Sequence, residues 1–306
     1  MRVTVEQLRD MKRQGRRFAM LTAYEYSIAR LLDDAGVPVL LVGDSLGSVV
    51  LGYDTTLPVT VEDIIRHTQA VVRGSRNALV VSDMPFMSFQ ESIEQALHNA
   101  GRMLKEGGCQ AVKLEGGAPM AETTRRLVEV GIPVMGHIGL TPQSVHQLGG
   151  HKVQGKTLAV ATRLLSDAQA LEEAGVFSIV LEGVPAALAQ RITAAVSVPT
   201  IGIGAGPRCD AQVQVIHDLL GLFSDFQPKH AKRYATLGPV IQDAVRRYAD
   251  DVVAGVFPTD KESFSMDERV LHELDEGRQG DRLPFDPAVA LAGTTEPDFS
   301  GYAPRS

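Results

Sequence analysis

The chain has 306 residues, of which 44% are hydrophobic and 22% are charged, and its formal net charge is −7. This composition is typical of a soluble globular protein, and no apolar stretch approaches the ~20 residues needed to span a bilayer. From Asp260 onward eleven acids stand against five bases, so nearly all of the net negative charge lies in the C-terminal segment. Neither part of the chain has the basic stripe that nucleic-acid binding requires, so we expect no nucleic-acid partner and no membrane.

The N-terminal segment and the cysteines indicate the compartment. Residues 1–18 include several bases but no apolar region followed by a cleavage site of small residues, so they do not resemble a secretory signal. The two cysteines, Cys109 and Cys209, are too few for a disulfide framework, and we expect both to be buried, reduced thiols. We therefore expect a cytoplasmic protein.

Apolar, strand-like runs alternate with segments of helical periodicity along most of the chain. The strand-like runs lie at residues 18–24, 39–45, 78–86, 111–117, 132–140, 178–184, 198–206 and 212–221. The segments between them with helical spacing of apolar residues lie at 26–37, 61–74, 92–108, 122–131, 167–175 and 186–196. Eight such units fit an α/β fold of the (β/α)8 TIM-barrel type, with the active site where the strands end. An open doubly wound sheet is the alternative, but it would not bring five strand ends to one place.

The barrel is expected to occupy residues 1–264 as the catalytic domain. Residues from about 240 to 258 have the pattern of a closing helix. Residues 265–306 form an acidic C-terminal extension with little apolar periodicity and four prolines, so we expect a mobile tail there.

Carboxylates end three consecutive strand-like runs, at Asp44, Asp83 and Glu115. In a barrel these side chains would meet at one mouth and offer hard oxygen ligands without sulfur. Such a set suits Mg²⁺ or another divalent ion, which keeps positions for water or a chelating substrate. The alternative is that each carboxylate caps the next helix or pairs with a lysine.

Three further polar residues lie at strand ends. Lys113 and Glu115 are two residues apart on one strand, so their side chains point to the same face. The lysine would hold a substrate carboxylate, form a Schiff base, or make a structural ion pair. Glu182 follows an apolar run with no basic residue near it in sequence, which suits a general base, although a solvated loop glutamate would look similar. His137 is the one histidine at a predicted strand end, and we expect it to support the site or to contact substrate.

Two glycine-rich motifs require interpretation. Residues 150–157, GHKVQGKT, satisfy the letters of a phosphate-binding P-loop, but no strand leads directly into them, so we do not expect nucleotide hydrolysis. In GIGAGPRCD, Pro207 occupies the place of the third glycine of a dinucleotide fingerprint. We expect Gly202, Gly204 and Gly206 to provide a tight turn or a close approach of backbone to substrate at the barrel rim.

Several long motifs, in order, resemble those of the ketopantoate hydroxymethyltransferase (3-methyl-2-oxobutanoate hydroxymethyltransferase) family. They are VLLVGDSLG, LVVSDMPF, AVKLEGG, PVMGHIGLTPQSV, GGHKVQGKT, VLEGVP and PTIGIGAGPRCD. The resemblance extends from about Thr4 to Phe264. Small departures, such as Ala211 where the family has glycine and Ser48 where it has methionine, leave the candidate metal, lysine and base positions intact.

The resemblance implies transfer of a hydroxymethyl group from 5,10-methylenetetrahydrofolate to 3-methyl-2-oxobutanoate, giving 2-dehydropantoate for pantothenate and coenzyme A biosynthesis. It implies a Mg²⁺-stabilised enolate and a homo-oligomer, commonly a decamer. The roles it implies are metal ligands at Asp44, Asp83 and Glu115, substrate contacts at Asp44, Ser45, Asp83 and Lys113, and the base at Glu182. The motifs do not indicate which residues form the folate pocket.

Three other functions remain open at this stage. A metal-dependent lyase or mutase acting on 2-oxo acids would use the same carboxylates without folate. A lysine-based aldolase would act through Lys113 and ignore chelators. A non-catalytic binding protein of the same fold would bind ligand without turnover.

Overall fold

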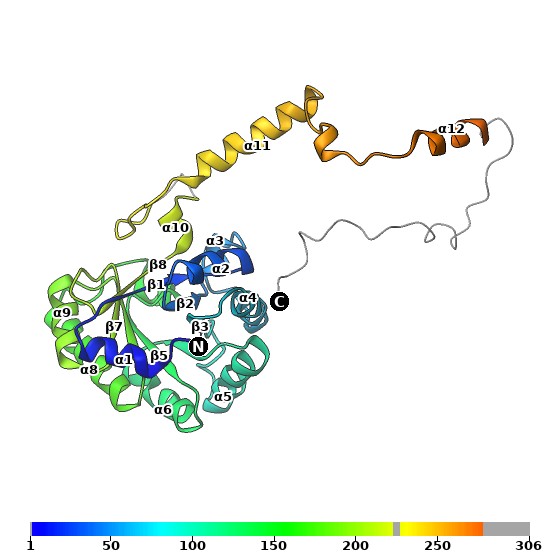
Figure 1. Cartoon of the computed structure of the whole chain (residues 1–306). Helices are drawn as coiled ribbons and strands as arrows, with labels where there is room; N and C mark the ends of the chain where they lie inside the picture. Colours follow the sequence, from blue (N-terminus) through cyan, green and yellow to red (C-terminus); the bar gives the residue numbers. More distant parts are fainter. Residues whose placement is uncertain (1, 223–226, 278–306) are drawn as a thin grey trace. The chain divides into compact units, whose positions relative to one another are not determined.

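The computed structural model describes residues 2–222 and 227–277 of a chain that divides into two compact units, Met1–Ile241 and Gln242–Ser306. The first unit is a closed barrel of eight parallel strands that follow one another in chain order (Figure 1). The strands are β1 (Phe18–Thr22), β2 (Val39–Val42), β3 (Leu79–Asp83), β4 (Ala111–Glu115), β5 (Val134–Gly139), β6 (Ser178–Glu182), β7 (Thr200–Ile203) and β8 (Ala211–Gln214). The predicted (β/α)8 barrel is therefore confirmed.

Helices surround the barrel and bury the outward-facing side of its strands (Figure 1). The longer ones are α2 (Tyr26–Asp34), α4 (Val61–Gly74), α5 (Ile93–Arg102), α6 (Ala121–Glu129), α8 (Leu158–Glu173) and α9 (Ala186–Ala195). Short helices α3 (Leu46–Val49), α7 (Val145–Leu148) and α10 (Ile216–Leu220) lie in the connections. Because helices cover the strands on one side and the barrel interior covers them on the other, strands such as β2 are apolar and buried throughout, which is why they appear as continuous apolar runs.

Two predicted elements have different bounds in the structure. Helix α8 begins at Leu158 rather than near residue 167, because Thr157 caps it by accepting a hydrogen bond from the Val160 backbone N–H at 3.4 Å. The predicted last strand, 212–221, ends at Gln214, and the rest forms α10. The Ile216 N–H donates to the Thr22 hydroxyl at 2.9 Å, which takes the backbone out of the sheet at this point.

The first helix, α1 (Val5–Arg13), contacts the N-terminal end of the barrel. Its Leu8 is fully buried in the same apolar cluster as the inward-facing strand residues Met20 and Leu79. The Lys12 ammonium donates to backbone carbonyls of Thr193 and Val198, at 2.9 Å each. With this end filled, the strand side chains available for chemistry are those at the opposite, C-terminal end.

The second unit, Gln242–Ser306, is helical where it is described. It contains most of α11 (Leu237–Val253), which matches the helix expected near 240–258, a short 3₁₀ helix at Asp260–Glu262, and α12 (Glu268–Gly277). Helix α12 lies within the segment predicted as a mobile tail, and residues 278–306 lie outside the described part of the chain. The division at residue 264, drawn from composition, stays a prediction.

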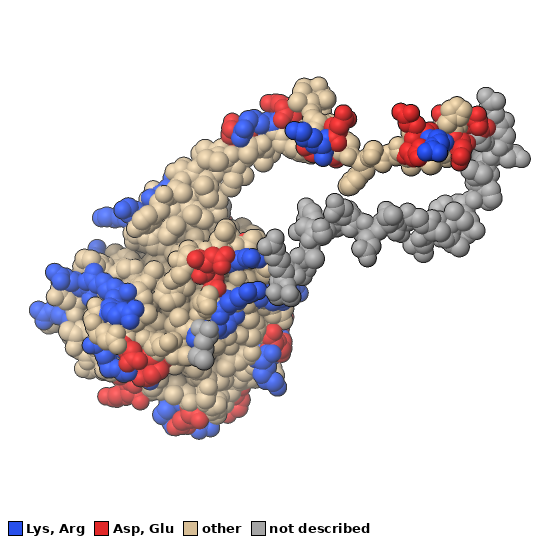
Figure 2. Space-filling model, viewed as in Figure 1, with Lys and Arg blue, Asp and Glu red and all other residues tan. Residues whose placement is uncertain are grey.

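The surface of the first unit carries acids and bases together. On the face shown in Figure 2, both kinds of side chain are present over the barrel unit. Many are paired, as Arg102 is with Glu62 at 2.8 Å and Arg126 with Glu129 at 2.8 Å, and such exposed pairs contribute little to stability. Within residues 2–222 and 227–277, no helix is long and apolar enough to cross a membrane.

Candidate active site

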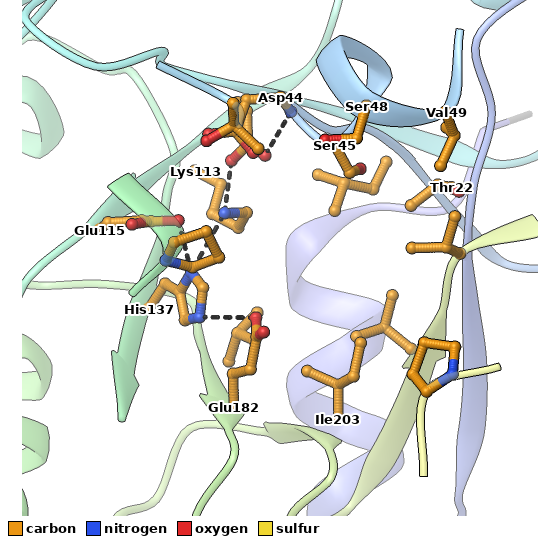
Figure 3. A pocket seen from close by; sticks show the side chains of 18 of the residues that line it. Thr22, Asp44, Ser45, Ser48, Val49, Lys113, Glu115, His137, Glu182 and Ile203 are labelled. Carbon is orange, nitrogen blue, oxygen red and sulfur yellow. Dashed lines mark hydrogen bonds and ion pairs between the residues drawn. The ribbon is translucent and has the colours of Figure 1, made fainter. Parts of the chain in front are cut away.

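All seven residues that the sequence analysis singled out as site residues line one pocket of about 290 Å³ at the C-terminal ends of the strands (Figure 3). The seven are Asp44, Ser45, Asp83, Lys113, Glu115, His137 and Glu182. Strand register explains the convergence, because Asp83 pairs with Lys113 and Glu115 with His137 on neighbouring strands. In Figure 3 the charged side chains lie along one side of the pocket and Val49 and Ile203 lie on the other.

A buried ion pair lies at the base of the charged side. The Lys113 ammonium is 2.5 Å from Asp83 Oδ1, and the Asp44 backbone N–H donates to Asp83 Oδ2 at 3.0 Å. Burial lowers the pKa of Lys113, but the carboxylates of Asp83, Glu115 and Asp44 outweigh it and raise the pKa above its usual range. Lys113 is therefore a fixed positive charge in a pocket of carboxylates.

Asp44 and Asp83 are held in an environment that disfavours two negative charges. Burial and then repulsion by Asp83 and Glu115 raise the pKa of Asp44 to about 8. Burial also raises the pKa of Asp83, and the neighbouring Lys113 reverses this only in part. A bound cation would relieve the repulsion between these carboxylates.

His137 bridges the two glutamates of the pocket. Its Nδ1 lies 3.4 Å from Glu115 Oε1 and 3.2 Å from Lys113 Nζ, and its Nε2 lies 3.3 Å from Glu182 Oε2 (Figure 3). Burial and Lys113 lower the pKa of His137, but the hydrogen bonds to Glu115 and Glu182 raise it to about 9. Glu182, which has no basic neighbour in sequence, thus has one in space because β5 lies beside β6.

Two buried residues of the site were not found from sequence. Gln143 donates through Nε2 to Asp44 Oδ2 and to the Met84 carbonyl, at 3.0 Å each, and its backbone N–H donates to Glu115 Oε2 at 3.0 Å. The Tyr24 hydroxyl lies 2.8 Å from the Ser45 hydroxyl. Gln143 is inside the motif PVMGHIGLTPQSV and Tyr24 is the last residue of the first predicted strand-like run, so position relative to a strand end was the available signal.

The donor set fits a divalent cation. Four carboxylates, one ammonium and one imidazolium leave two negative charges when all are ionised, and the available ligands are oxygens. In the part of the chain that the structure describes, no three His, Cys, Asp or Glu side chains converge on one metal position. Mg²⁺ commonly takes one or two protein carboxylates and completes its shell with water and substrate. Asp44 and Asp83, which the hydrogen bond from the Asp44 N–H to Asp83 holds side by side, are the carboxylates that would hold it.

Comparisons with known proteins agree over most of the chain. The sequence profile of the ketopantoate hydroxymethyltransferase family matches residues 2–260. A 3-methyl-2-oxobutanoate hydroxymethyltransferase of Dehalococcoides mccartyi is 62% identical over 274 residues, covering 90% of this chain and 98% of the relative. The enzyme of the same name from Carboxydothermus hydrogenoformans is 58% identical over 273 residues, covering 89% and 99%.

Among solved structures, phosphonopyruvate hydrolase in complex with oxalate and Mg²⁺ has a TM-score of 0.56 at 13% identity. The alignment covers 90% of this chain and 97% of the hydrolase. At this identity the likeness shows a shared fold.

Proposed function

The chain belongs to the ketopantoate hydroxymethyltransferase family, and we propose that it transfers a hydroxymethyl group from 5,10-methylenetetrahydrofolate to 3-methyl-2-oxobutanoate. The product, 2-dehydropantoate, would feed pantothenate and coenzyme A biosynthesis. Relatives of this name match about nine-tenths of the chain, so the protein is a hydroxymethyltransferase. The observation that carries the finer proposal is the convergence of Asp44, Asp83, Lys113 and Glu182 in one buried pocket beside an apolar wall.

The acceptor fits the pocket by charge and shape. Its carboxylate would lie near the Lys113 ammonium, whose positive charge is secured by the surrounding carboxylates. Its branched alkyl end would contact the apolar side, where Val49 and Ile203 lie. The pocket volume of about 290 Å³ is just below the usual range for ligand sites of about 300–1,000 Å³, which suits a small 2-oxo acid.

Asp44 and Asp83 would hold a divalent cation, which would supply Lewis-acid stabilisation of the negative charge on the 2-oxo oxygen. The chain's own part is to hold these two carboxylates in register. The Asp44 N–H bonds to Asp83, and Gln143 bonds to Asp44. Preorganised charge of this kind is usually the largest contribution to rate acceleration.

Glu182 is the group we assign to remove the C3 proton. It ends β6, and its carboxylate is partly exposed to the pocket, while His137 Nε2 at 3.3 Å fixes its orientation. A positioned base contributes about 10²–10⁴-fold to rate. His137 acts here as a positioning residue, because its two ring nitrogens face Glu115 and Glu182.

Overall, the C3–H bond and the two C–N bonds of the folate methylene carbon break, and a C3–C bond and a C–O bond form. Water supplies the hydroxyl oxygen. The C3 proton and the two water protons end on the new hydroxyl and on the two folate nitrogens, so tetrahydrofolate leaves with the balance complete.

The alternatives differ in what they require. A lyase or mutase acting on 2-oxo acids would use the same acidic pocket but would be indifferent to folate. A Schiff-base aldolase needs a neutral lysine, and the charge and close pairing of Lys113 with Asp83 disfavour it. A non-catalytic binding protein would not need a base such as Glu182 beside the acceptor site.

We also propose that the chain acts as a homo-oligomer, which the family resemblance implies to be a decamer. Helix α11 supports this, because it carries an apolar stripe that is exposed in the single chain. The stripe comprises Val240, Ile241, Val245, Tyr248 and Val252. Light scattering after size-exclusion chromatography measures the assembly, and a monomeric mass would contradict it.

The cysteines support the predicted cytoplasmic location. Cys109 and Cys209 are both buried and free, and burial raises the pKa of the Cys109 thiol to about 11. Unpaired, unreactive thiols are typical of proteins from a reducing compartment.

The test of the function is a proton NMR time course of 3-methyl-2-oxobutanoate with 5,10-methylenetetrahydrofolate and Mg²⁺, with and without a chelator. We expect a new hydroxymethyl signal that the chelator abolishes. A reaction of the acceptor that proceeds without folate would favour the lyase or mutase. Absence of any reaction from folded protein would reject the transferase.

A further inference from the structure

A second cavity, of about 730 Å³, lies beside the acceptor pocket in the same unit of the chain. Its lining combines apolar side chains, glycine backbone and three basic residues, His151, Lys229 and His230. Four of its lining residues, His151, Glu182, Pro228 and His230, also line the acceptor pocket. The two cavities therefore share a wall that contains Glu182.

We propose that this larger cavity binds the one-carbon donor, a reduced folate, with its methylene carbon toward Glu182 and its glutamate carboxylates toward Lys229. The proposal rests on the transferase function proposed above. It assigns a site to the co-substrate that the sequence motifs leave unplaced.

Size separates the two substrates. The acceptor pocket, at about 290 Å³, accommodates a small acid, whereas sites for larger organic ligands commonly have about 300–1,000 Å³. The second cavity, at about 730 Å³, lies well inside that range. A bicyclic ring joined to an aromatic amide and a glutamate needs the larger volume.

The reaction requires the two substrates to meet at Glu182. The proton leaves C3 of the acceptor toward this carboxylate, and the electron pair left on C3 forms the bond to the methylene carbon of the donor. Because reacting atoms must approach to about 3–3.5 Å, the donor has to enter the space next to Glu182. The shared wall brings the larger cavity to Glu182.

The walls suit a flat heterocycle. Leu140 and Val184 are buried apolar side chains, and Val153, on the adjacent loop, is half exposed at 47%. Gly204 and Gly206 have φ angles of +63° and +79°, which side chains other than glycine rarely adopt. A Cβ at Gly204 would meet His230 and one at Gly206 would meet Ala186, so glycine at these positions lets the loop pack closely against other residues of the same wall.

The charge of the lining suits a carboxylate tail. Lys229 lines the larger cavity and not the acceptor pocket, and Glu182 is the one acid among the lining residues. Folates carry at least two carboxylates at the end opposite the ring, and an exposed ammonium attracts them in proportion to their number.

The loop 150–157, whose sequence matches the P-loop pattern, lies beside the larger cavity. Helix α7 precedes it, whereas a nucleotide-hydrolysing P-loop directly follows a strand. Two of its residues, His151 and Val153, form one side of the larger cavity. The loop thus contributes His151 and Val153 to the wall of the proposed donor site.

The first test is steady-state kinetics of the full-length protein with Mg²⁺, comparing wild type with Val153→Trp. The larger side chain would occupy the cavity, so we expect the KM for 5,10-methylenetetrahydrofolate to rise by about tenfold or more. The KM for 3-methyl-2-oxobutanoate should not change. Leu158→Trp is the matched control, because Leu158 is 85% exposed and does not line the cavity.

A folate-independent readout separates this inference from the proposed function. Exchange of the C3 proton of 3-methyl-2-oxobutanoate in D₂O, followed by NMR, uses the acceptor pocket alone, and we expect Val153→Trp to exchange at the wild-type rate. An unchanged folate KM in a variant that exchanges normally overturns the cavity assignment and leaves the transferase intact. A wild-type protein that neither exchanges nor transfers overturns the function itself.

A charge variant decides the matter if Val153→Trp loses both activities through misfolding. Lys229→Glu should raise the KM for the triglutamate form of the donor more than that for the monoglutamate form. Lys156→Glu is the control, because Lys156 is an exposed lysine of the loop 150–157 that does not line the cavity. Equal effects of Lys229→Glu on both forms, or no effect, would refute the placement of the carboxylate tail.

Discussion

The side-chain amide of Gln143 donates a hydrogen bond to Asp44 Oδ2 at 3.0 Å and thereby connects the loop after β5 with the end of β2. The same residue donates through its backbone N–H to Glu115 Oε2 at 3.0 Å, at the end of β4. Gln143 is buried and bonds to two carboxylates from different strands. It therefore fixes the distance between Asp44 and Glu115 without adding a charge of its own.

Gln143→Glu should impair the site while leaving the fold intact. The substitution keeps the shape but replaces a donor with a carboxylate facing Asp44, so repulsion would displace Asp44. We expect Mg²⁺ affinity or kcat/KM to fall by about 10–100-fold, the usual effect of removing a partner of a metal ligand. Titration calorimetry with Mg²⁺ and steady-state kinetics measure the two effects.

Gln147→Glu is the control for that substitution, since Gln147 is exposed on the neighbouring helix α7. It adds the same charge outside the pocket and should leave both measurements unchanged. Equal losses in the two variants would mean that added surface charge, not the contact with Asp44, caused them.

The strand ends could be read from the sequence because buried parallel strands are continuous apolar runs, and a charged residue at the end of such a run stands out. Asp44, Asp83, Lys113 and Glu115 were found in this way, and the barrel then brings them together. An uncharged residue in a loop gives no comparable signal. Gln143 reaches Asp44 because a 3₁₀ turn follows β5, and that turn is not visible in the sequence pattern.

Contacts between side chains on neighbouring strands also could not be predicted from the sequence. His137 and Glu182 are adjacent because of the register of β5 and β6, where Gly139 pairs with Glu182. The larger cavity depends on loops after several strands, whose conformations involve glycines with positive φ such as Gly204. Spacing along the chain does not determine either arrangement.

Glu182→Gln should bind 3-methyl-2-oxobutanoate normally but lose turnover by about 10²–10⁴-fold, because an amide cannot accept the C3 proton. Loss of C3 proton exchange in D₂O would locate the defect at proton removal. Glu173→Gln, on the exposed end of α8, should behave as wild type. Wild-type exchange in Glu182→Gln would remove this residue from the role of base.

Lys113 should not form a covalent adduct with the substrate. Its ammonium is paired with Asp83 at 2.5 Å, and the nearby carboxylates raise the pKa of Lys113, so the neutral amine needed for a Schiff base is scarce. Treatment with 3-methyl-2-oxobutanoate and borohydride should leave the mass of the chain unchanged, whereas Lys113→Met should raise the KM for this acceptor. A reduced adduct at Lys113 would favour the aldolase.

Asp33 does not line the acceptor pocket, and we expect it to stabilise the fold. Its buried carboxylate accepts hydrogen bonds from the backbone N–H groups of Arg76, Asn77 and Ala78, at 2.7–3.0 Å, and so joins α2 to the segment before β3. Removing the carboxylate leaves these donors without their acceptor. We expect Asp33→Ala to lower the free energy of unfolding by about 3 kcal/mol, as measured by urea denaturation.

The pH dependence of that loss follows from the same hydrogen bonds. Burial raises the pKa of Asp33, but the backbone donors lower it more, so its pKa in the folded chain lies below the usual value. The stabilisation is therefore complete above the usual aspartate pKa of about 4 and is lost as the pH falls through the folded-state pKa. The difference in stability between wild type and Asp33→Ala should therefore begin to narrow as the pH falls below about 4. Asp34→Ala, which removes an exposed carboxylate next in sequence, should match wild type, and a loss equal to that of Asp33→Ala would contradict the assignment to these buried hydrogen bonds.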